Sequence, residues 1–385
     1  MIKSVLIANR GEIAIRIART ARRMGIKTYV VRTAKEPEAV YLSAADAVIN
    51  FPETDGNIPE FLDIDRLVGL AREYKIDSLH PGYGYLSENA ELAERCRDNG
   101  IVFIGPSPEV IRLMGDKVAA KGIAAQSGVP MLGASQGAVH TLDEARKIAK
   151  RLGYPVIIKA VSGGGGRGMR IVHHQDELEQ LYKIATAEAQ VAFNDPSVFI
   201  EKYLENPKHI EFQIVADNYG NVVHLGEREC SIQRKHQKLM EEAPSPALDE
   251  RLRKKMAAAA VSLAKQAGYQ SLGTVEFLLD HQKHFYFMEM NTRIQVEHPV
   301  TEEITGIDLV ELQFNIAAGR KLPLRQSQIH LNGWSIECRI NAEDVQAGFS
   351  PSIGVIRQLR LPQGNHIRIE TGIAHGSEIT PFFDS

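Results

Sequence analysis

The chain contains 385 residues, 44% of them hydrophobic and 24% charged, and its 45 basic and 48 acidic side chains leave a net charge of -3. This balance is typical of a globular protein with two or three domains, since one domain takes roughly 150 residues. It excludes a dedicated nucleic-acid binder, and no apolar stretch approaches the roughly 18 residues that a membrane helix needs. The 3 cysteines predict neither a disulfide framework nor a zinc site. The N-terminal segment lacks the long apolar core of a secretory signal, so we expect a cytoplasmic protein.

The first part of the chain alternates short apolar segments with amphipathic ones. This rhythm predicts a βαβα arrangement and a parallel, doubly wound sheet covered by helices on both faces. The expected elements are strands at 5–8, 28–31, SLH and IVFIG, and helices at 12–24 and 60–74. The turn at 9–12 lacks the glycine fingerprint of a dinucleotide fold, which removes most support for nicotinamide binding. Gly82 and Gly84 follow a strand, where open α/β sheets gather ligands, and a structural turn is the alternative reading of that loop.

A second unit follows a helical connector at 107–128. Its small module, near 130–203, contains helices at 141–152 and 176–192 and strands at PVIIKA, MRIVHH and SVFIEKYL. The remaining expected elements are strands at 209–216 and 221–226, a helix at 249–267, a hairpin of 274–280 with 284–291, a helix at 308–318, and short strands near 334–341, 354–361 and 366–370.

A glycine-rich loop, SGGGGRG at 162–168, joins two of these strands. It formally matches G-x-G-x-x-G, but a strand rather than a helix follows it, which excludes both a Rossmann loop and a P-loop. Such a turn is typical of a flap whose backbone N–H groups close over phosphate oxygens. Lys159 and Lys117 would add positive charge beside those phosphates. A flexible linker is the alternative.

Single carboxylates interrupt the apolar strands of the expected hairpin at Glu276 and Glu289. Because side chains alternate along a strand, Glu289 and Asn291 point the same way and Glu276 can meet them from the neighbouring strand. An oxygen-only cluster suits magnesium together with substrate phosphates. Buried glutamates paired with arginines are the alternative.

The same alternation continues through Arg293, Gln295 and Glu297. If the chain stays extended, one face carries a guanidinium fork, an amide and a carboxylate, which together fit a small planar oxyanion and can remove its proton. A solvated edge strand is the alternative. Further charged and polar residues crowd into ERECSIQRKHQK, for which a solvated loop is the alternative; they are Glu227, Gln233, Lys235, His236 and Lys238.

Together these segments resemble the biotin carboxylase family of ATP-grasp enzymes. The matching blocks span nearly the whole chain and include IANRGEIA, HPGYGYLSEN, RLMGDK, GGGGRGMR, EKYLENPKHIE, ERECSIQRKHQK, MEMNTRIQVEHPVTE and ECRINAED. The resemblance implies an α/β ATP-grasp fold, α+β in its C-terminal part. Its expected units are a Rossmann-like domain at 1–115, a helical linker at 116–129, a lid with the glycine loop at 130–203, a catalytic part at 204–330 and a C-terminal domain at 331–385 that stops short of the family's usual end.

The resemblance also implies roles for individual residues. The phosphates of ATP would be held by Lys117, Lys159, Gly165 and Gly166. The adenine hinge would be Glu201, Lys202, Tyr203 and Leu204, and the ribose side would be lined by His209, Gln233 and His236. Two magnesium or manganese ions, and through them ATP, would be bound by Glu276, Glu289 and Asn291. Bicarbonate would be held by Lys238, Arg293, Gln295 and the backbone of Val296. Glu297 would be the base, Arg339 would stabilise the negative charge that develops on biotin, and Tyr83 and Gly84 would lie near its ureido ring.

The implied reaction has two steps. Bicarbonate attacks the γ-phosphate of ATP to give carboxyphosphate, and the carboxyl unit then passes to biotin on a biotin carboxyl carrier protein. A carboxyltransferase would be the second partner, and the helix with Arg19 and Arg23 would help to form a homodimer. An acyl-CoA carboxylase is the favoured assignment. The alternatives are the N-terminal domain of a pyruvate carboxylase, another ATP-grasp ligase that joins a carboxylate to an amine, and a nucleotide-binding module without turnover.

Overall fold

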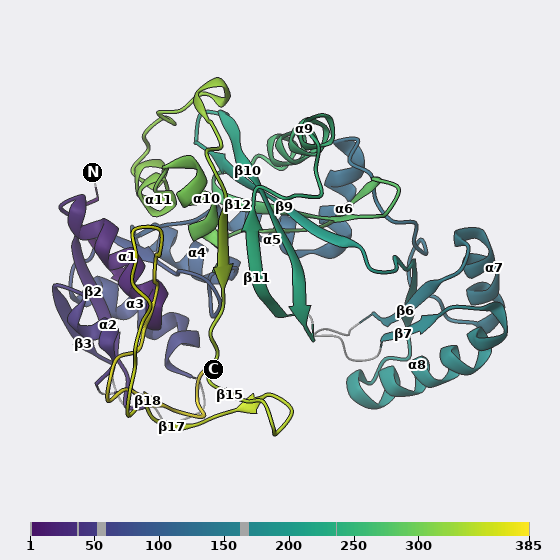
Figure 1. Cartoon of the computed structure of the whole chain (residues 1–385), viewed down its shortest axis with the longest axis horizontal. Helices are drawn as coiled ribbons and strands as arrows, with labels where there is room; N and C mark the ends of the chain where they lie inside the picture. Colours follow the sequence, from purple (N-terminus) through teal and green to yellow (C-terminus); the bar gives the residue numbers. More distant parts are fainter. Residues whose placement is uncertain (1, 37, 52–58, 162–168, 236, 385) are drawn as a thin grey trace.

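The computed structural model describes residues 2–36, 38–51, 59–161, 169–235 and 237–384. Within this part of the chain, a 5-stranded, a 6-stranded and a 3-stranded sheet form the three main units. Figure 1 shows the N-terminal unit and the small 3-stranded unit on opposite sides of the large central sheet. The α/β fold class predicted from the sequence is therefore confirmed.

The N-terminal sheet is parallel throughout and has the order β3-β2-β1-β4-β5. Its strands are β1 (Ser4–Ile7), β2 (Lys27–Arg32), β3 (Ala47–Asn50), β4 (Ser78–His80) and β5 (Val102–Phe103). The helices around it are α1 (Gly11–Arg23), α2 (Val40–Ser43), α3 (Ile64–Glu73) and α4 (Ala90–Asp98), with a 3-10 turn η1 (Glu60–Leu62). Val5 packs with Ile13 of α1, whereas Leu6 packs with Leu67 of α3. Alternate residues of β1 are thus buried on opposite faces, as a doubly wound sheet requires.

The connector consists of two short helices, α5 (Pro108–Gly115) and α6 (Lys117–Gln126). The small unit beyond it is an antiparallel sheet of order β7-β6-β8, with strands β6 (Val156–Ala160), β7 (Met169–Val172) and β8 (Val198–Lys202). Its helices are α7 (Leu142–Leu152) and α8 (Leu178–Phe193), preceded by the 3-10 turn η2 (Gln175–Glu177). This unit has a hydrophobic core of its own, which includes Val156, Ile158 and Ile200.

The central sheet has the order β13-β12-β9-β10-β11-β14. Its strands are β9 (Lys208–Ala216), β10 (Val222–Arg234), β11 (Gln237–Ala243), β12 (Ser271–Leu279), β13 (Phe285–Asn291) and β14 (Ser335–Cys338). The helices of this part are α9 (Glu250–Gln266), α10 (His298–Thr305) and α11 (Leu309–Ala317), and the 3-10 turn η3 (Gln326–Gln328) follows them. The strand expected at 221–226 continues to Arg234, so much of the charged segment forms a hairpin with β11 instead of a solvated loop.

The two faces of β9 differ in chemistry. Phe212 and Ile214 pack in the same core as Met256 of α9. Glu211 and Gln213 are also fully buried, but their side chains point to the opposite face because residues alternate along a strand. A single strand therefore supplies one wall of the hydrophobic core and one wall of a buried polar site.

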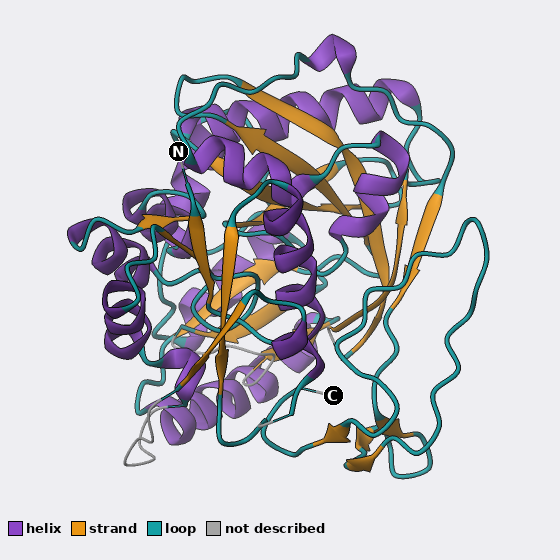
Figure 2. Cartoon of the chain, turned by 90° about the vertical axis from the view of Figure 1, so that its left-hand side faces the viewer, coloured by secondary structure: helices purple, strands orange, loops and turns teal. Residues whose placement is uncertain are grey.

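The segment after β14 contains only short strands, namely β15 (Glu343–Asp344), β16 (Ser350–Pro351), β17 (Gly354–Val355) and β18 (Glu378–Ile379). Figure 2 shows them near the C-terminus, joined by long loops. The strand expected at 354–361 is reduced to the two residues of β17, and the strand expected at 366–370 is wrong. Arg368 and Glu370 are held by ion pairs to Glu302 and Arg19 rather than by a strand ladder, which explains the misleading alternation. None of the described helices is both long and apolar enough to cross a membrane.

Candidate active site

The two carboxylates expected to share a site lie on directly opposite positions of neighbouring strands. Glu276 of β12 pairs in register with Glu289 of β13. The side-chain amide of Asn291 donates a 2.7 Å hydrogen bond to Glu276 Oε1. Burial and the charge of Glu276 raise the pKa of Glu289. Glu276 and Asn291 of this oxygen-bearing cluster are buried, whereas Glu289 is exposed at its edge. The two carboxylates so close together favour a cation.

Lys238 of β11 lies at the centre of the polar site. Its Nζ is 2.6, 2.9 and 2.8 Å from carboxylate oxygens of Glu211, Glu276 and Glu297. Burial opposes a charge on Lys238, but these carboxylates outweigh burial and hold its pKa well above the usual range. The ammonium group thus joins the carboxylate cluster to the expected base.

Arg228 of β10 is a fully buried residue that the sequence analysis did not single out. Its guanidinium donates to Glu211 Oε1 and to Gln295 Oε1, each at 2.5 Å. Its other acceptors, at 2.8 to 3.1 Å, are Gln213, Thr274 and Thr301. Arg228 therefore fixes both Gln295 and the carboxylate that contacts Lys238. Glu211 interrupts an apolar strand just as Glu276 does, so the same sequence signal could have found it.

The expectation of one extended face from Asn291 to Glu297 is wrong. The strand ends at Asn291, a turn follows, and α10 begins at His298 with Pro299 in its first turn. Proline is preorganised for the start of a helix, which ends the alternation. Arg293 consequently points towards the N-terminal domain, where its Nε donates a 3.0 Å hydrogen bond to Glu88 Oε2.

The turn nevertheless brings Arg293 and Gln295 to the carboxylate cluster, where each makes its own hydrogen bond. Gln295 Nε2 donates a 2.9 Å hydrogen bond to Glu276 Oε1. Arg293 Nη2 donates a 3.1 Å hydrogen bond to Asn291 Oδ1. Val296 lies in the turn itself, and Glu297 is the N-cap residue of α10. Short turns and a helix start, rather than a strand, thus collect these groups.

Glu297 lies between two cations. Besides its contact with Lys238, its Oε2 is 2.9 Å from a guanidinium nitrogen of Arg339. Burial and the charge of Glu211 raise the pKa of Glu297, but Lys238, Arg228 and Arg339 outweigh them and lower it below its usual range. Glu297 is therefore ionised at neutral pH, as a proton acceptor must be.

The loop after β4 carries Tyr83 and Gly84. The side-chain amide of Asn9 fastens it by donating to the carbonyl oxygens of Pro81 at 2.7 Å and Tyr83 at 2.8 Å. Gly84 has φ of +66°, a backbone conformation that other residues adopt at a cost. The Tyr83 hydroxyl donates to Glu12, and burial, followed by the charge of Glu12, raises its pKa. The turn at 9–12 thus supports this loop rather than a dinucleotide.

Two lysines converge on Glu201 of the small unit. Lys159 of β6 and Lys121 of α6 each place Nζ 2.6 Å from a different oxygen of Glu201. Burial raises the pKa of Glu201, but the two lysines outweigh burial and lower it to about 2. Lys121 was not singled out from the sequence. Lys121 belongs to the connector, and through Glu201 it is linked to Lys159, the expected phosphate-binding residue of the small unit.

The remaining expected nucleotide residues occupy several places. Lys202 Nζ donates to the carbonyl oxygens of Gly153 and Tyr154, and Tyr203 and Leu204 follow β8. His209 Nε2 lies 2.7 Å from Glu276 Oε2. Gln233 Nε2 donates to the carbonyl oxygen of Cys230 at 2.8 Å and lies 3.0 Å from His209 Nδ1. Lys117 is exposed at the start of α6. Gly165, Gly166 and His236 lie outside the described residues.

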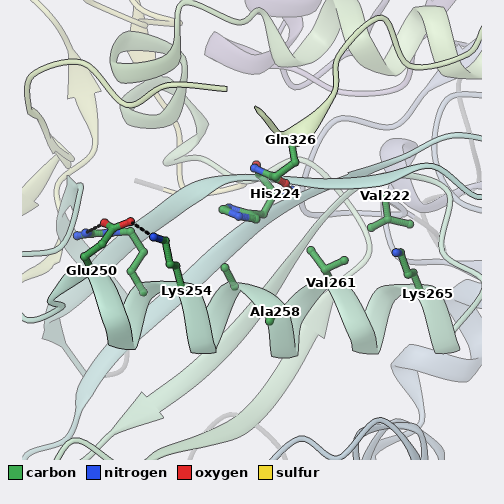
Figure 3. Close-up of a pocket in the computed structure, with 10 residues that line it drawn as sticks. Val222, His224, Glu250, Lys254, Ala258, Val261, Lys265 and Gln326 are labelled. Atoms are coloured by element: carbon green, nitrogen blue, oxygen red, sulfur yellow. Dashed lines mark hydrogen bonds and ion pairs between the residues drawn. The ribbon is translucent and has the colours of Figure 1, made fainter. Parts of the chain in front are cut away.

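A separate cavity of about 440 Å³ lies along α9, and none of the residues above lines it. Figure 3 shows Val261 and Ala258 of α9 facing Val222 and His224 of β10, with Gln326 above them. Because α9 covers the apolar face of β9, this cavity lies apart from the buried polar cluster.

Models of three protein families match successive parts of the chain. Residues 1–111 match the family described as "Biotin carboxylase, N-terminal domain", and residues 337–385 match "Biotin carboxylase C-terminal domain". Residues 116–325 match "Carbamoyl-phosphate synthase L chain, ATP binding domain".

The similar proteins include a biotin carboxylase of Nostoc sp., 52% identical over 99% of this chain and 85% of that protein. The 2-oxoglutarate carboxylase small subunit of Hydrogenobacter thermophilus is 49% identical over 100% of this chain and 81% of its own length. One similar solved structure is the biotin carboxylase domain dimer of that 2-oxoglutarate carboxylase, in complex with MgADP and bicarbonate. Its TM-score is 0.91 at 49% identity, and the match covers 100% of this chain and 84% of that one. The biotin carboxylase of Campylobacter jejuni has a TM-score of 0.92 at 46% identity, covering 100% and 86%.

These matches define a class of ATP-grasp enzyme. Within that class, the chain belongs to the biotin carboxylase family.

Proposed function

We propose that this chain uses ATP and bicarbonate to carboxylate biotin, as the first half-reaction of a biotin-dependent carboxylase. One observation carries the proposal: an ionised glutamate, Glu297, lies between Lys238 and Arg339, and the same lysine contacts the carboxylate cluster. A base for bicarbonate, a cation for its charge and an arginine for biotin thus lie within one connected group of side chains.

The carboxylate cluster fits magnesium or manganese. Its donors are oxygen atoms, and burial together with the charge of Glu276 raises the pKa of Glu289, an effect that a bound cation would offset. Glu276, Glu289 and Asn291 would hold the ion or ions. When bound, such an ion would neutralise charge on the phosphates of ATP. Lys159 would add a further positive charge to the same phosphates, and the glycine loop would close over them.

Bicarbonate would bind beside this cluster. Lys238 and Arg293 would balance its negative charge, and Gln295 would orient it through a hydrogen bond. As an oxygen of bicarbonate attacks the γ-phosphate, Glu297 would take the proton of bicarbonate. ADP leaves, and carboxyphosphate is the product of this first step. Holding these groups in a buried site protects the labile product from water.

Biotin would approach from the side of Arg339. The carboxyl unit of carboxyphosphate would pass to N1 of the ureido group, with phosphate as the leaving group that takes up the N1 proton, and the guanidinium would stabilise the negative charge that develops there. Tyr83 and Gly84 would line the approach of biotin. The biotin would be attached to a carrier protein, and a carboxyltransferase would select the final acceptor. An acyl-CoA acceptor remains a prediction, because relatives named for 2-oxoglutarate and pyruvate carboxylation are also 49% and 48% identical to this chain. The cytoplasmic location also remains a prediction.

A homodimer is part of the proposal because one similar structure is described as a dimer of biotin carboxylase domains. The two arginines expected at a dimer helix are engaged within the chain. Arg19 pairs with Glu370 at 2.6 Å, and Arg23 pairs with Asp308 and Glu311 at 2.8 and 2.7 Å. Any dimer contact through α1 therefore competes with these ion pairs.

ADP release by the full chain, with and without bicarbonate and free biotin, tests this function. We expect bicarbonate-dependent release that biotin stimulates. Arg293→Ala and Glu297→Ala should abolish it with a modest effect on nucleotide affinity, whereas Arg320→Ala on the surface should leave it unchanged. A large loss of ATP binding in either site variant would show that the assigned roles are misplaced.

A further inference from the structure

Two glutamates outside the proposed roles lie directly opposite each other beside Arg339. Glu241 of β11 and Glu337 of β14 are partners in the antiparallel ladder. Glu241 is 1% exposed. One oxygen of each carboxyl, Oε2, is buried and has no hydrogen-bond partner among the described residues. Opposite side chains of an antiparallel pair have Cβ atoms about 4.5–5.5 Å apart, which is close enough for two carboxyl groups to meet.

Two ionised carboxylates in this position would repel each other, and both buried oxygens would remain without a donor. A single proton removes both difficulties. It halves the charge of the pair, and it turns one carboxyl into a hydrogen-bond donor for the other. Closely spaced carboxyl groups that share a proton titrate as a pair rather than as two independent acids.

We propose that Glu241 and Glu337 share one proton at neutral pH, and that this proton leaves the two carboxyls and Arg339 together without net charge, so that an anionic substrate can bind there. The inference rests on the proposed roles of Arg339 and Glu297 in biotin carboxylation. It adds a positioning pair that contacts neither bicarbonate nor biotin and acts through Arg339.

The charges around Arg339 support this assignment. Glu241 Oε1 lies 2.7 Å from a guanidinium nitrogen of Arg339. With one shared proton, the pair carries one negative charge, which balances the single positive charge of Arg339. Without that proton the three groups carry a net negative charge, which repels bicarbonate and the developing charge on biotin. The other charged or titratable groups that act on the pair or on its arginine are Glu297 before α10, Glu211 of β9, Arg228 of β10 and Tyr83 in the loop after β4.

The pKa values of the two carboxyls agree with the geometry. Burial raises the pKa of Glu241 to about 7, although Arg339 opposes the shift. Burial and then the charge of Glu241 raise the pKa of Glu337 to about 8. A carboxyl whose pKa is raised by folding binds its proton more tightly in the folded state, so its proton-dependent stability is lost as pH rises through the folded pKa.

The test uses Glu337→Gln in the full chain. The amide can donate to Glu241 and carries no charge, so it imitates the shared proton at every pH. The matched control is Glu242→Gln, the next residue along β11, whose side chain points to the other face of the strand. For each protein, kcat/KM for bicarbonate would be measured from pH 7 to pH 9 as ADP release with free biotin.

We expect kcat/KM of the unaltered chain and of Glu242→Gln to fall above about pH 8, approaching about tenfold per pH unit, while Glu337→Gln stays within about twofold. The same alkaline fall in Glu337→Gln would overturn the proposal. If the unaltered chain shows no bicarbonate-dependent turnover even at pH 7, the proposed function fails. Thermal unfolding then tests separately whether Glu241 and Glu337 share a proton. Between pH 6 and pH 9 the Tm of Glu337→Gln should fall less than the Tm of the unaltered chain. An equal fall in both proteins would refute the shared proton.

Discussion

Replacing Arg228 by methionine tests whether buried charge positions the bicarbonate site. The substitution replaces the apolar stem of arginine with an unbranched apolar side chain, but it leaves Glu211 without its guanidinium partner and Gln295 without its donor. Removing one member of a buried ion pair costs about 3–5 kcal/mol. Lys238 still contacts Glu211 at 2.6 Å, so we expect a loss at the lower end of this range, about 3 kcal/mol. That is a large part of a total unfolding free energy of about 5–15 kcal/mol.

The effect on function follows from Gln295. A hydrogen bond from the Gln295 amide to the bicarbonate anion is worth about 1.5–3 kcal/mol when it is well held. A side chain that is no longer held keeps only part of it, and a loss of roughly 1 kcal/mol is about fivefold in affinity. We expect the KM for bicarbonate to rise about five- to tenfold in Arg228→Met, with a change of less than about twofold in the KM for MgATP. The assay is initial-rate ADP release at varied bicarbonate, together with denaturant unfolding.

Arg253→Met is the matched control. Arg253 of α9 pairs at 2.8 Å with Glu227, the buried residue next to Arg228 on β10, which points to the opposite face. This variant should also lose stability but keep the KM for bicarbonate. An equal rise in that KM in both variants would show that Arg228 acts only through stability. No rise in Arg228→Met would refute the positioning argument.

Two further predictions concern the metal cluster and the small unit. Glu276→Gln should weaken magnesium-dependent ATP binding by at least about tenfold in calorimetry while binding of nucleotide without metal changes little, and equal losses in both would contradict the metal assignment. Glu201 contributes stability that is present above its unfolded pKa near 4.5 and is lost as pH falls towards its folded value of about 2. The unaltered chain should therefore unfold at higher denaturant than Glu201→Gln at pH 7, and the difference should narrow below about pH 5; a constant difference would argue against the ion pair with Lys159 and Lys121.

The sequence predicted those parts of the site that depend on neighbours in one hairpin or one turn. Alternation in two adjacent strands was enough to place Glu276 opposite Glu289, and the βαβα rhythm was enough for the parallel sheet. The extended face after Asn291 failed because Pro299 starts a helix, a signal that was present in the sequence.

Other parts depend on the register of strands that are distant in the sequence. Glu241 meets Glu337 only because β14 pairs with β11 at the edge of the sheet. In the sequence, Arg228 is one charge among others in a polar segment. In the fold, β9 and the turn before α10 surround its guanidinium with hydrogen-bond acceptors. Local patterns carry no information about such pairings, so these residues emerge only from the fold.

The most direct test of the central claim is transfer of labelled carbon. The full chain would be incubated with ATP, magnesium, free biotin and ¹³C-bicarbonate, and carboxybiotin would be sought by NMR at mildly alkaline pH. Labelled carboxybiotin that requires ATP and is absent from Glu297→Ala is the predicted result. Bicarbonate-dependent ATP hydrolysis without any labelled biotin would contradict the assignment of Arg339 and its neighbours to biotin carboxylation.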